Sequence, residues 1–569
     1  MDSKTACDAK EVTLNVKGAA AAAIGVPEDA DHAKQLGELK GWLSQPRFKD
    51  VTRPYTAEDV LPLRSLVPVV YPSVFSSTKA WQLFEELQAK REFSHTFGAL
   101  DPVQVVQMAE AGLTSVYVSG WQCSSTASST REVGPDTADY PMDTVPKKVD
   151  QLFRAQAFHA RRQRERRARM TVEERKATPV VDYLPPIIAD ADTGHGGLSA
   201  VMRLTKLMIE AGAAGAHYED QRAGSKKCGH QGGKVLVATR EHINRLVAAR
   251  LEADICGVPF LVVARTDAQA ATLLDNNIDP RDHPFILGCV VEDLPPLTDV
   301  LESAGDVAEA TAKWKSEAGE LVTYEEAVVA ALQKTYKGEE LVAKLADWKA
   351  FNEFRFNGLA NHEARKYAGQ KLGVDPYWSW DAPRTVEGYY VVRGSDEMGW
   401  ARATAFSPYC DLLWMETKKP VLKQAQRLVE FVRKELGKQF GPERAARQKF
   451  AYNLSPSFNW SAAGLSDEEI EAFITELGKL GFVWQFITLA GFHADGLSTG
   501  LFARDYAKRK MAAYVQGIQR EEKKHGISTL LHQTWSGAEF MDRCQQLISG
   551  GKSSTTSMQS GSTEAQFKQ

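Results

Sequence analysis

A five-residue loop carries the most reactive side chains of the chain. It reads Lys226-Lys227-Cys228-Gly229-His230, so a thiol stands between two ammonium groups and an imidazole. Positive charge nearby stabilises a thiolate, which predicts a lowered pKa for the Cys228 thiol. The same residues also fit an exposed basic turn with an incidental cysteine, so the other polar residues of the chain have to decide between the two interpretations.

Four acidic residues form a second group. Asp190 and Asp192 follow a predicted strand, Glu219 ends the next strand, and Asp136 lies in an earlier loop. Carboxylate oxygens without a matching set of histidines or cysteines are typical ligands of Mg²⁺ or Mn²⁺. We therefore expect a Mg²⁺ site with Asp190 as the direct ligand and the other carboxylates acting through water. The alternative is a solvated acidic rim.

A third group offers hydrogen-bond donors to an anion. Arg265 can bind a carboxylate through two parallel hydrogen bonds, and hydroxyl and amide groups suit a second carboxylate. The candidate donors are Arg265, His230, Asn453, Ser455, Ser457, Thr488 and the backbone of Ser119, Gly120 and Trp121. They predict a small polycarboxylate substrate. Phosphate stays an alternative, although the chain has neither a P-loop nor a glycine-rich dinucleotide motif. Beside such a substrate, Cys228 suits acid–base chemistry at carbon better than nucleophilic hydrolysis.

These residues stand at the ends of repeated βα units. Eight short apolar runs, each typical of a buried parallel strand, alternate with helical patterns. The runs cover residues 95–99, 114–119, 186–191, 214–219, 260–266, 411–416, 450–455 and 485–490. This alternation predicts an α/β fold of the (β/α)₈ barrel type, whose active site forms at the C-terminal ends of the strands.

The remaining segments flank or interrupt the barrel. We expect a flexible tail at 1–30, a helical segment at 31–94, the barrel at 95–288 and 382–500, an inserted helical subdomain at 289–381, C-terminal helices at 501–548 and a flexible tail at 549–569. Within the C-terminal part, 503–524 is predicted as one helix and 537–548 as another.

Composition argues against several classes of function. The chain is 43% hydrophobic and 25% charged, with a formal net charge of −4. This composition is typical of a soluble globular protein and indicates no binding to nucleic acid or to a membrane surface. Its seven cysteines are scattered without a CxxC pair, so neither a disulfide framework nor a structural zinc site is indicated. The arginine run from Arg161 to Arg169 is interrupted by Glu165 and is interpreted as a solvated helix face.

Together the motifs resemble those of the isocitrate lyase family, in the superfamily that also contains phosphoenolpyruvate mutase. The resemblance runs from about Gly41 to the C-terminus, and the insertion at 289–381 is similar to that of fungal and plant members. The matching motifs are Lys226-Lys227-Cys228-Gly229-His230, Ser119-Gly120-Trp121-Gln122, Trp414-Met415-Glu416-Thr417, Asn453-Leu454-Ser455-Pro456-Ser457-Phe458-Asn459-Trp460 and Thr488-Leu489-Ala490-Gly491-Phe492-His493.

The resemblance implies reversible retro-aldol cleavage of isocitrate to glyoxylate and succinate, in the glyoxylate cycle. It also implies a Mg²⁺ cofactor and a homotetramer that exchanges C-terminal helices between subunits. Cys228 would protonate the succinate carbanion, with Lys226, Lys227 and His230 tuning its pKa in a loop that closes over the site. Tyr117 or a metal-linked carboxylate would remove the hydroxyl proton. The substrate would contact Ser119, Gly120, Trp121, Gly229, His230, Arg265, Glu416, Asn453, Leu454, Ser455, Pro456, Ser457 and Thr488, with Glu416 also counted as catalytic.

Three alternatives stay open. A 2-methylisocitrate lyase would use the same site, but Lys227 and the Ser455-Pro456-Ser457 stretch favour isocitrate. The arginine run would suit a nucleic-acid-binding protein, and a barrel without activity could serve as a scaffold, although intact Cys228 and Asp190 argue against that. The C-terminal residues lack a peroxisomal tripeptide, which favours the cytoplasm, with the glyoxysome or peroxisome as the alternative.

Overall fold

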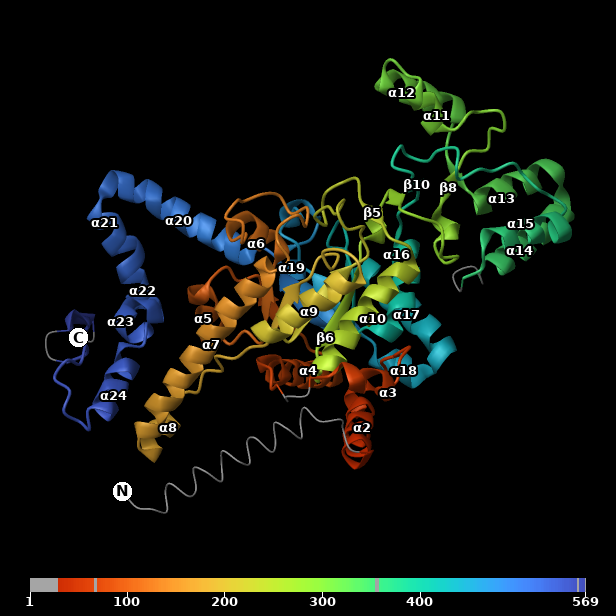
Figure 1. The fold of residues 1–569 in the computed structure, drawn as a ribbon. Helices are drawn as coiled ribbons and strands as arrows, with labels where there is room; N and C mark the ends of the chain where they lie inside the picture. Colours follow the sequence, from red (N-terminus) through yellow and green to blue (C-terminus); the bar gives the residue numbers. More distant parts are fainter. Residues whose placement is uncertain (1–28, 66–68, 354–357, 560–561, 568–569) are drawn as a thin grey trace.

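Eight parallel strands form a closed barrel at the centre of the computed structural model, which describes residues 29–65, 69–353, 358–559 and 562–567 (Figure 1). A parallel bridge between Gly98 and Tyr117 joins the first and last strands of the series and closes the ring. The spatial order is β1 (Ser94–Phe97), β13 (Phe482–Ile487), β12 (Lys449–Asn453), β11 (Leu412–Met415), β6 (Leu261–Thr266), β4 (Gly215–Glu219), β3 (Ile187–Asp190) and β2 (Val116–Val118). The predicted (β/α)₈ barrel is thereby confirmed.

Helices that follow the strands surround the barrel. They are α5 (Pro102–Glu110), α7 (Thr144–Arg169), α9 (Leu198–Ala211), α10 (Thr239–Cys256), α16 (Asp396–Phe406), α17 (Leu422–Phe440) and α19 (Asp467–Leu480). Each brings an apolar stripe to the strands, as α9 does with its buried Val201, Leu204 and Met208. Gly212 ends α9 in the left-handed conformation at φ +93°, which turns the chain directly into β4.

The helix α4 (Pro72–Lys90) fills the N-terminal end of the barrel. Its Ala80 and Phe84 are fully buried and pack in one cluster with the interior residues Tyr117 and Trp414. The Ser77 hydroxyl donates a 2.9 Å hydrogen bond to the carbonyl of Ala214. Apolar side chains occupy most of this end, so the main polar cluster of the interior lies at the C-terminal ends of the strands.

The expected inserted subdomain lies between β6 and α16 and projects from the barrel (Figure 1). It contains α11 (Leu297–Glu302), α12 (Val307–Ala318), α13 (Tyr324–Thr335), α14 (Gly338–Asn352) and α15 (Asn361–Tyr367). Its core includes the buried residues Tyr324, Trp348 and Trp378 and is a cluster separate from the barrel core. Cys289 and Ser379 exchange two backbone hydrogen bonds of 2.9 Å, so the chain leaves and re-enters the barrel at nearly one point.

Two predicted boundaries are wrong. The eighth strand spans Phe482–Ile487 instead of 485–490, because Gly481 at φ +107° ends α19 immediately before Phe482 and because α20 (Ala490–Arg509) begins at Ala490. The single helix expected at 503–524 is broken, since Lys510 adopts φ +56° and separates α20 from α21 (Met511–Tyr514). The later helices are α22 (Arg520–His525), α23 (His532–Trp535) and α24 (Ala538–Ile548).

The C-terminal helices return to the outside of the barrel (Figure 1). The Ser528 hydroxyl donates a 2.6 Å hydrogen bond to Glu110 of α5, and Arg162 of α7 donates to the carbonyl of Trp535 at 2.6 Å. Asp542 of α24 accepts hydrogen bonds from the backbone N–H groups of Ser557 and Met558. These contacts tie the described part of the tail to α24, which its Ser- and Gly-rich composition does not indicate. The tail expected at 1–30 lies outside the described residues, except that α2 (Asp29–Leu43) begins at Asp29.

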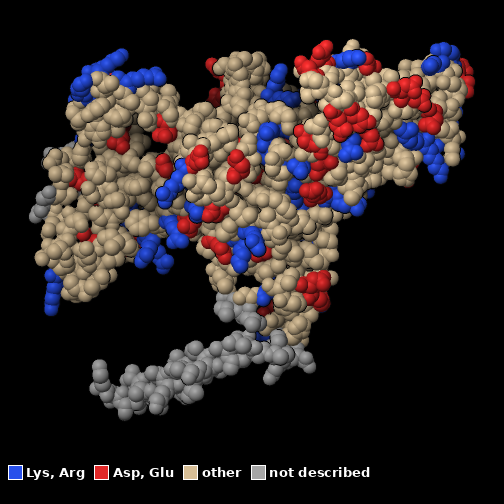
Figure 2. Space-filling model, turned by 45° about the horizontal axis from the view of Figure 1, so that its top comes forward, with Lys and Arg blue, Asp and Glu red and all other residues tan. Residues whose placement is uncertain are grey.

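Some side chains of the arginine run make contacts within the protein, and others face the solvent. Arg167 donates to the carbonyls of Thr178 and Arg175 at 2.8 and 3.0 Å, whereas Arg169 pairs with Glu165 on the exposed side of α7. On the face in Figure 2, basic and acidic side chains are interspersed over the surface rather than gathered in one basic field. Over the described ranges, no helix combines the length and apolar character needed to cross a bilayer.

Candidate active site

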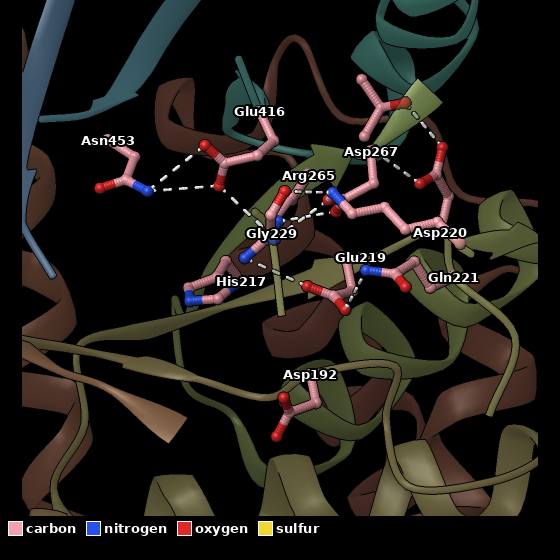
Figure 3. Close-up of polar contacts among 12 residues, drawn as sticks. Asp192, His217, Glu219, Asp220, Gln221, Gly229, Arg265, Asp267, Glu416 and Asn453 are labelled. Carbon is pink, nitrogen blue, oxygen red and sulfur yellow. Dashed lines mark hydrogen bonds and ion pairs between the residues drawn. The ribbon is translucent and has the colours of Figure 1, made fainter. Parts of the chain in front are cut away.

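Arg265, at the C-terminal end of β6, is the centre of the polar cluster in the barrel mouth (Figure 3). Its guanidinium donates to Asp267 at 2.8 and 3.1 Å and lies 3.2 Å from Glu219 and 3.5 Å from Glu416. The ring of Trp414 supports it from a distance of 4.4 Å. Burial alone would lower the pKa of Arg265, but Asp267, Glu219 and Glu416 raise it well above its usual range, so the planar donor group expected from the sequence stays charged and is held in a fixed position.

Asn453 and His230 extend this cluster toward the catalytic loop, by which we mean residues 222–234. The Asn453 amide donates to both Glu416 oxygens at 3.3 and 3.2 Å. The His230 ring lies 3.2 Å from the carbonyl of Thr417 and 3.4 Å from the Ser455 hydroxyl. A loop histidine thus contacts the ends of two barrel strands, so the loop lies over the site as expected for a closed lid.

Lys226 does not tune the thiol in the way the sequence indicated. Its fully buried ammonium lies 2.6 Å from Asp136 and 2.7 Å from Asp192. Burial alone would raise the pKa of Asp192, yet Lys226 and His195 hold it well below its usual range. Lys227 contributes through its backbone, which exchanges hydrogen bonds of 2.8 and 2.9 Å with the side chain of Gln221.

The prediction of a lowered Cys228 pKa is wrong. Burial and the nearby Asp136 carboxylate raise the pKa of this thiol, and together they outweigh the opposing effect of Lys226. The ammonium that the sequence places next to the thiol is occupied by two carboxylates instead. At neutral pH Cys228 is therefore a protonated thiol, a state that suits a proton donor and not a nucleophile.

Asp190 occupies the end of β3 with all its oxygens engaged by nearby groups. It accepts from the backbone of Gly120 at 3.0 Å and from Asp192 at 2.9 Å, and the Tyr117 hydroxyl lies 3.3 Å away. Burial and the neighbouring Asp192 raise its pKa to about 6. Burial also raises the pKa of Tyr117 well above its usual range, which keeps the phenol protonated. As a base, Tyr117 is thus less suited than a carboxylate.

The four acidic residues predicted as one metal site have different partners. Asp136 and Asp192 pair with the Lys226 ammonium, Asp190 accepts from the backbone N–H of Asp192, and Glu219 pairs with Arg265 and accepts from Gln221 at 3.1 Å. Figure 3 shows Asp192 well apart from Glu219. In the part of the chain that the structure describes, no three His, Cys, Asp or Glu side chains are arranged as a ready metal site. The place of Glu219 in the expected ligand set stays a prediction.

Donor chemistry around Lys226 nevertheless fits a hard cation. Asp136 and Asp192 pair with this one ammonium and Asp190 accepts from Asp192, so carboxylates outnumber the ammonium, and burial raises the pKa of Asp136 to about 6. The Oδ1 atom of Asp136 is buried and has no hydrogen-bond partner among the described residues. Oxygen-only donors with unneutralised charge suit Mg²⁺ or Mn²⁺.

The remaining predicted contacts are spread around the mouth. Ser119 caps α6 (Gly120–Thr126), and the ring of Trp121 packs edge-on against Phe492 at 5.0 Å. Gly120 has no room for a side chain, because a Cβ there would lie 2.6 Å from the Tyr140 hydroxyl. The other positions differ in exposure: Leu454 and Ser455 are buried, Gly229 is buried, Pro456 and Thr488 are half-buried, and Ser457 is exposed.

Sequence reasoning missed several residues of the site. His217 is fully buried in β4, 3.0 Å from the Tyr117 hydroxyl, and burial lowers its pKa far enough to keep the ring neutral. The two-residue period of the strand, which puts His217 on the same face as Glu219, could have indicated it. Lys234 is also fully buried, and only its position at the end of the glycine-rich loop gave a signal.

Comparisons with known proteins agree with this site. The isocitrate lyase family model matches residues 35–567. Isocitrate lyase from Oryza sativa subsp. japonica is 48% identical over 95% of this chain and 94% of its own length, and that from Saccharomyces cerevisiae is 44% identical over 96% and 97%. A mitochondrial 2-methylisocitrate lyase from Hypocrea atroviridis is 44% identical over 95% of each chain. The chain belongs to the isocitrate lyase family of carbon–carbon lyases.

Proposed function

We propose that the chain cleaves isocitrate to glyoxylate and succinate, in a reversible retro-aldol reaction. One observation carries this proposal. The loop that bears the protonated Cys228 thiol lies beside Arg265, Asn453 and Ser455 at the C-terminal ends of the barrel strands. A thiol that can give a proton to carbon stands over groups that bind carboxylates, which are the two requirements for releasing succinate as a stable product.

The binding groups divide between the two halves of the substrate. Asn453, Ser455, Ser457 and Thr488 lie at the ends of β12 and β13 and suit the carboxylates of the succinate half. Arg265 suits a carboxylate nearer the acidic group, since its guanidinium is already fixed by Asp267. Binding through several fixed donors orients the bond to be broken and excludes water.

Mg²⁺ is the cofactor we propose, with Asp190 as direct ligand and Asp136, Asp192 and Glu219 in supporting positions; Mn²⁺ is the alternative. The cation would supply charge stabilisation for the oxygens of the glyoxylate half. Lys226 sits between the supporting carboxylates, so its ammonium balances part of their charge. A carboxylate of this group would accept the hydroxyl proton of the substrate, because the Tyr117 phenol stays protonated.

Cys228 then completes the reaction by giving its proton to the carbanion of succinate. The raised pKa of the thiol means that the proton is present before the bond breaks. In the reverse direction the thiolate takes a proton from succinate. Both directions need the loop closed, because an open loop would let water protonate the carbanion.

A coupled assay of 2-oxo-acid release tests the proposal. Isocitrate and 2-methylisocitrate are compared at equal concentration, with Mg²⁺ and with a chelator. We expect release from isocitrate that depends on the divalent cation. No release from isocitrate under any of these conditions would refute the proposed function.

A 2-methylisocitrate side activity is the second candidate. It is favoured by the Hypocrea atroviridis relative, which matches as closely as the yeast isocitrate lyase at 44% identity. One methyl group is worth only about 1–3 kcal/mol of discrimination in a pocket. The same assay gives the ratio of the two activities.

We also propose a homotetramer in which C-terminal helices are exchanged. Leu497 and Leu501 of α20 are 65% and 57% exposed, and among the residues of this helix only Gly491 is buried. A helix of this length with exposed leucines is better stabilised against another subunit than in water. Light scattering coupled to size exclusion tests the assembly, with a monomer as the outcome against it.

A further inference from the structure

One lysine joins the catalytic loop to the barrel and has no part in the reaction proposed above. Lys234 is 0% exposed, and its ammonium donates 2.5 Å hydrogen bonds to the carbonyl of Gly229 and to Asp267. Gly229 lies in the catalytic loop, whereas Asp267 follows the barrel strand β6. The two acceptors of this ammonium thus come from a segment that must move to admit substrate and from one that does not.

The backbone of Lys234 is fixed to the barrel side of this junction. Its carbonyl accepts hydrogen bonds from Thr272 and Leu273 at 3.4 and 3.2 Å. The next residues form β5 (Val235–Leu236), which pairs with β7 (Leu273–Leu274) in a small sheet beside the barrel. The Lys234 backbone is therefore fixed at the end of the catalytic loop, and its side chain reaches back to Gly229 within the loop.

Asp267 connects the same lysine to the substrate-binding arginine. One of its oxygens accepts from both Lys234 and Arg265, and the other accepts from Arg265 alone. The backbone of Asp267 is held in turn by Asp220, which accepts its N–H at 2.9 Å. Because every group in this series is buried, a shift of one member changes the position of the next.

Gly229 also lies close to Arg265 itself. A Cβ built at Gly229 would lie 2.9 Å from an Arg265 nitrogen and 2.9 Å from a Glu416 oxygen. The Gly229 backbone therefore lies near Arg265, and hydrogen bonds through Lys234 and Asp267 connect the two residues.

From this arrangement we infer that Lys234 is a positioning residue that latches the closed catalytic loop and couples its closure to the orientation of Arg265. The inference rests on the proposed function, since it concerns the loop that carries the proton donor. In the open loop, the Gly229 carbonyl leaves Lys234 and is solvated, while the Lys234–Asp267 pair remains. Closure exchanges that solvation for a buried hydrogen bond to a charged donor, which favours the closed state.

The test uses the accessibility of Cys228 as a readout of closure that does not depend on turnover. Native protein and Lys234→Met are treated with iodoacetamide in the presence of Mg²⁺, with and without saturating succinate and glyoxylate, and Cys228 modification is followed by mass spectrometry. We expect the two ligands to protect Cys228 in the native protein. In Lys234→Met, alkylation in their presence should be faster by about tenfold or more, because the loop opens more often. Misplacement of Arg265 should also lower kcat/KM by about 100-fold.

Lys449→Met is the matched control. Lys449 is a buried lysine paired with the carboxylate of Glu85, but it lies at the N-terminal end of β12, away from the site. This variant loses the ion pair of a buried lysine with a half-exposed glutamate, and it should keep native protection of Cys228. Equal loss of protection in both variants, or full protection in Lys234→Met, would overturn the inference.

A second variant covers the case in which Lys234→Met does not fold. Lys234→Gln keeps a donor for Asp267, but its side chain is one bond shorter and cannot reach both acceptors. It should fold and still lose protection of Cys228, and native protection in this variant would also count against the latch. If the native protein itself shows no protection by succinate and glyoxylate, the proposed function fails instead, so the two failures are distinguishable.

Discussion

The ammonium of Lys226 lies 2.6 Å from the carboxylate of Asp136, although 90 residues of chain separate the two. This ion pair joins the catalytic loop to the loop between α6 and α7, and both side chains are buried. A lysine that appears in the sequence as a neighbour of the thiol thus acts on the acidic side of the site.

Lys226→Met tests that assignment. Removal of one partner from a buried ion pair leaves the other charge uncompensated, which lowers the free energy of unfolding by about 3–5 kcal/mol. We expect kcat/KM for isocitrate to fall by about 100-fold or more. In Lys227→Met, kcat/KM for isocitrate should fall by about tenfold or less, because the hydrogen bonds of Lys227 to Gln221 are made by its backbone. Equal losses in the two variants would contradict the assignment.

Two glycines of the same loop give a matched pair of substitutions. A Cβ at Gly229 would approach Arg265 and Glu416 to 2.9 Å, whereas a Cβ at Gly232 meets nothing within 4 Å. Gly229→Ala should therefore hinder closure and lower kcat/KM by about 10- to 100-fold. Gly232→Ala should stay close to the native value in the same steady-state assay. Native kinetics for Gly229→Ala would show that the loop closes differently in solution.

The thiol should react slowly at neutral pH. Because burial and Asp136 raise the pKa of Cys228, its thiolate fraction keeps rising with pH beyond the usual range of a cysteine. In the protein without substrate or product, alkylation by iodoacetamide should increase about tenfold per pH unit through pH 8, and a plateau below pH 8 would contradict the raised pKa. Cys228→Ser should fold normally and lose nearly all turnover, and native turnover in this variant would remove the proton-transfer role.

Acid should weaken the barrel through Asp411. This buried carboxylate pairs with Arg47 and Arg250 at 2.6 Å each. Burial alone would raise its pKa, but the two arginines hold it well below its usual range. The unfolded chain therefore takes up the proton at the higher pH, so the stabilisation is complete above about pH 5 and is lost as pH falls below about 4.

Asp411→Asn provides the measurement. At pH 7 it should lower the free energy of unfolding by about 3–5 kcal/mol, because two buried arginines lose their partner. The difference from the native protein should shrink in urea melts at pH 3 to 4. Asp150→Asn, which breaks an exposed pair with Arg154, should leave the free energy of unfolding unchanged within error at either pH. A pH-independent effect of Asp411→Asn would contradict the lowered pKa.

Most of the barrel could be predicted because its strands are short apolar runs that end in polar residues. The eighth strand was misplaced, since Thr488 resembles such a polar end although it lies in the turn before α20. The site was predicted in composition but not in pairing. Nothing local indicates that Lys226 binds Asp136 and Asp192, or that Glu219 belongs with Arg265, because these partners are brought together only by closure of the barrel.

The two ends of the inserted subdomain meet at Cys289 and Ser379. A segment whose ends are already adjacent adds little closure entropy to the chain that hosts it. Its own core around Trp348 and Trp378 also means that it takes no side chains from the barrel interior. Evolution can therefore lengthen, shorten or delete this segment as a module, and the chemistry in the barrel mouth would pass through such changes unaltered.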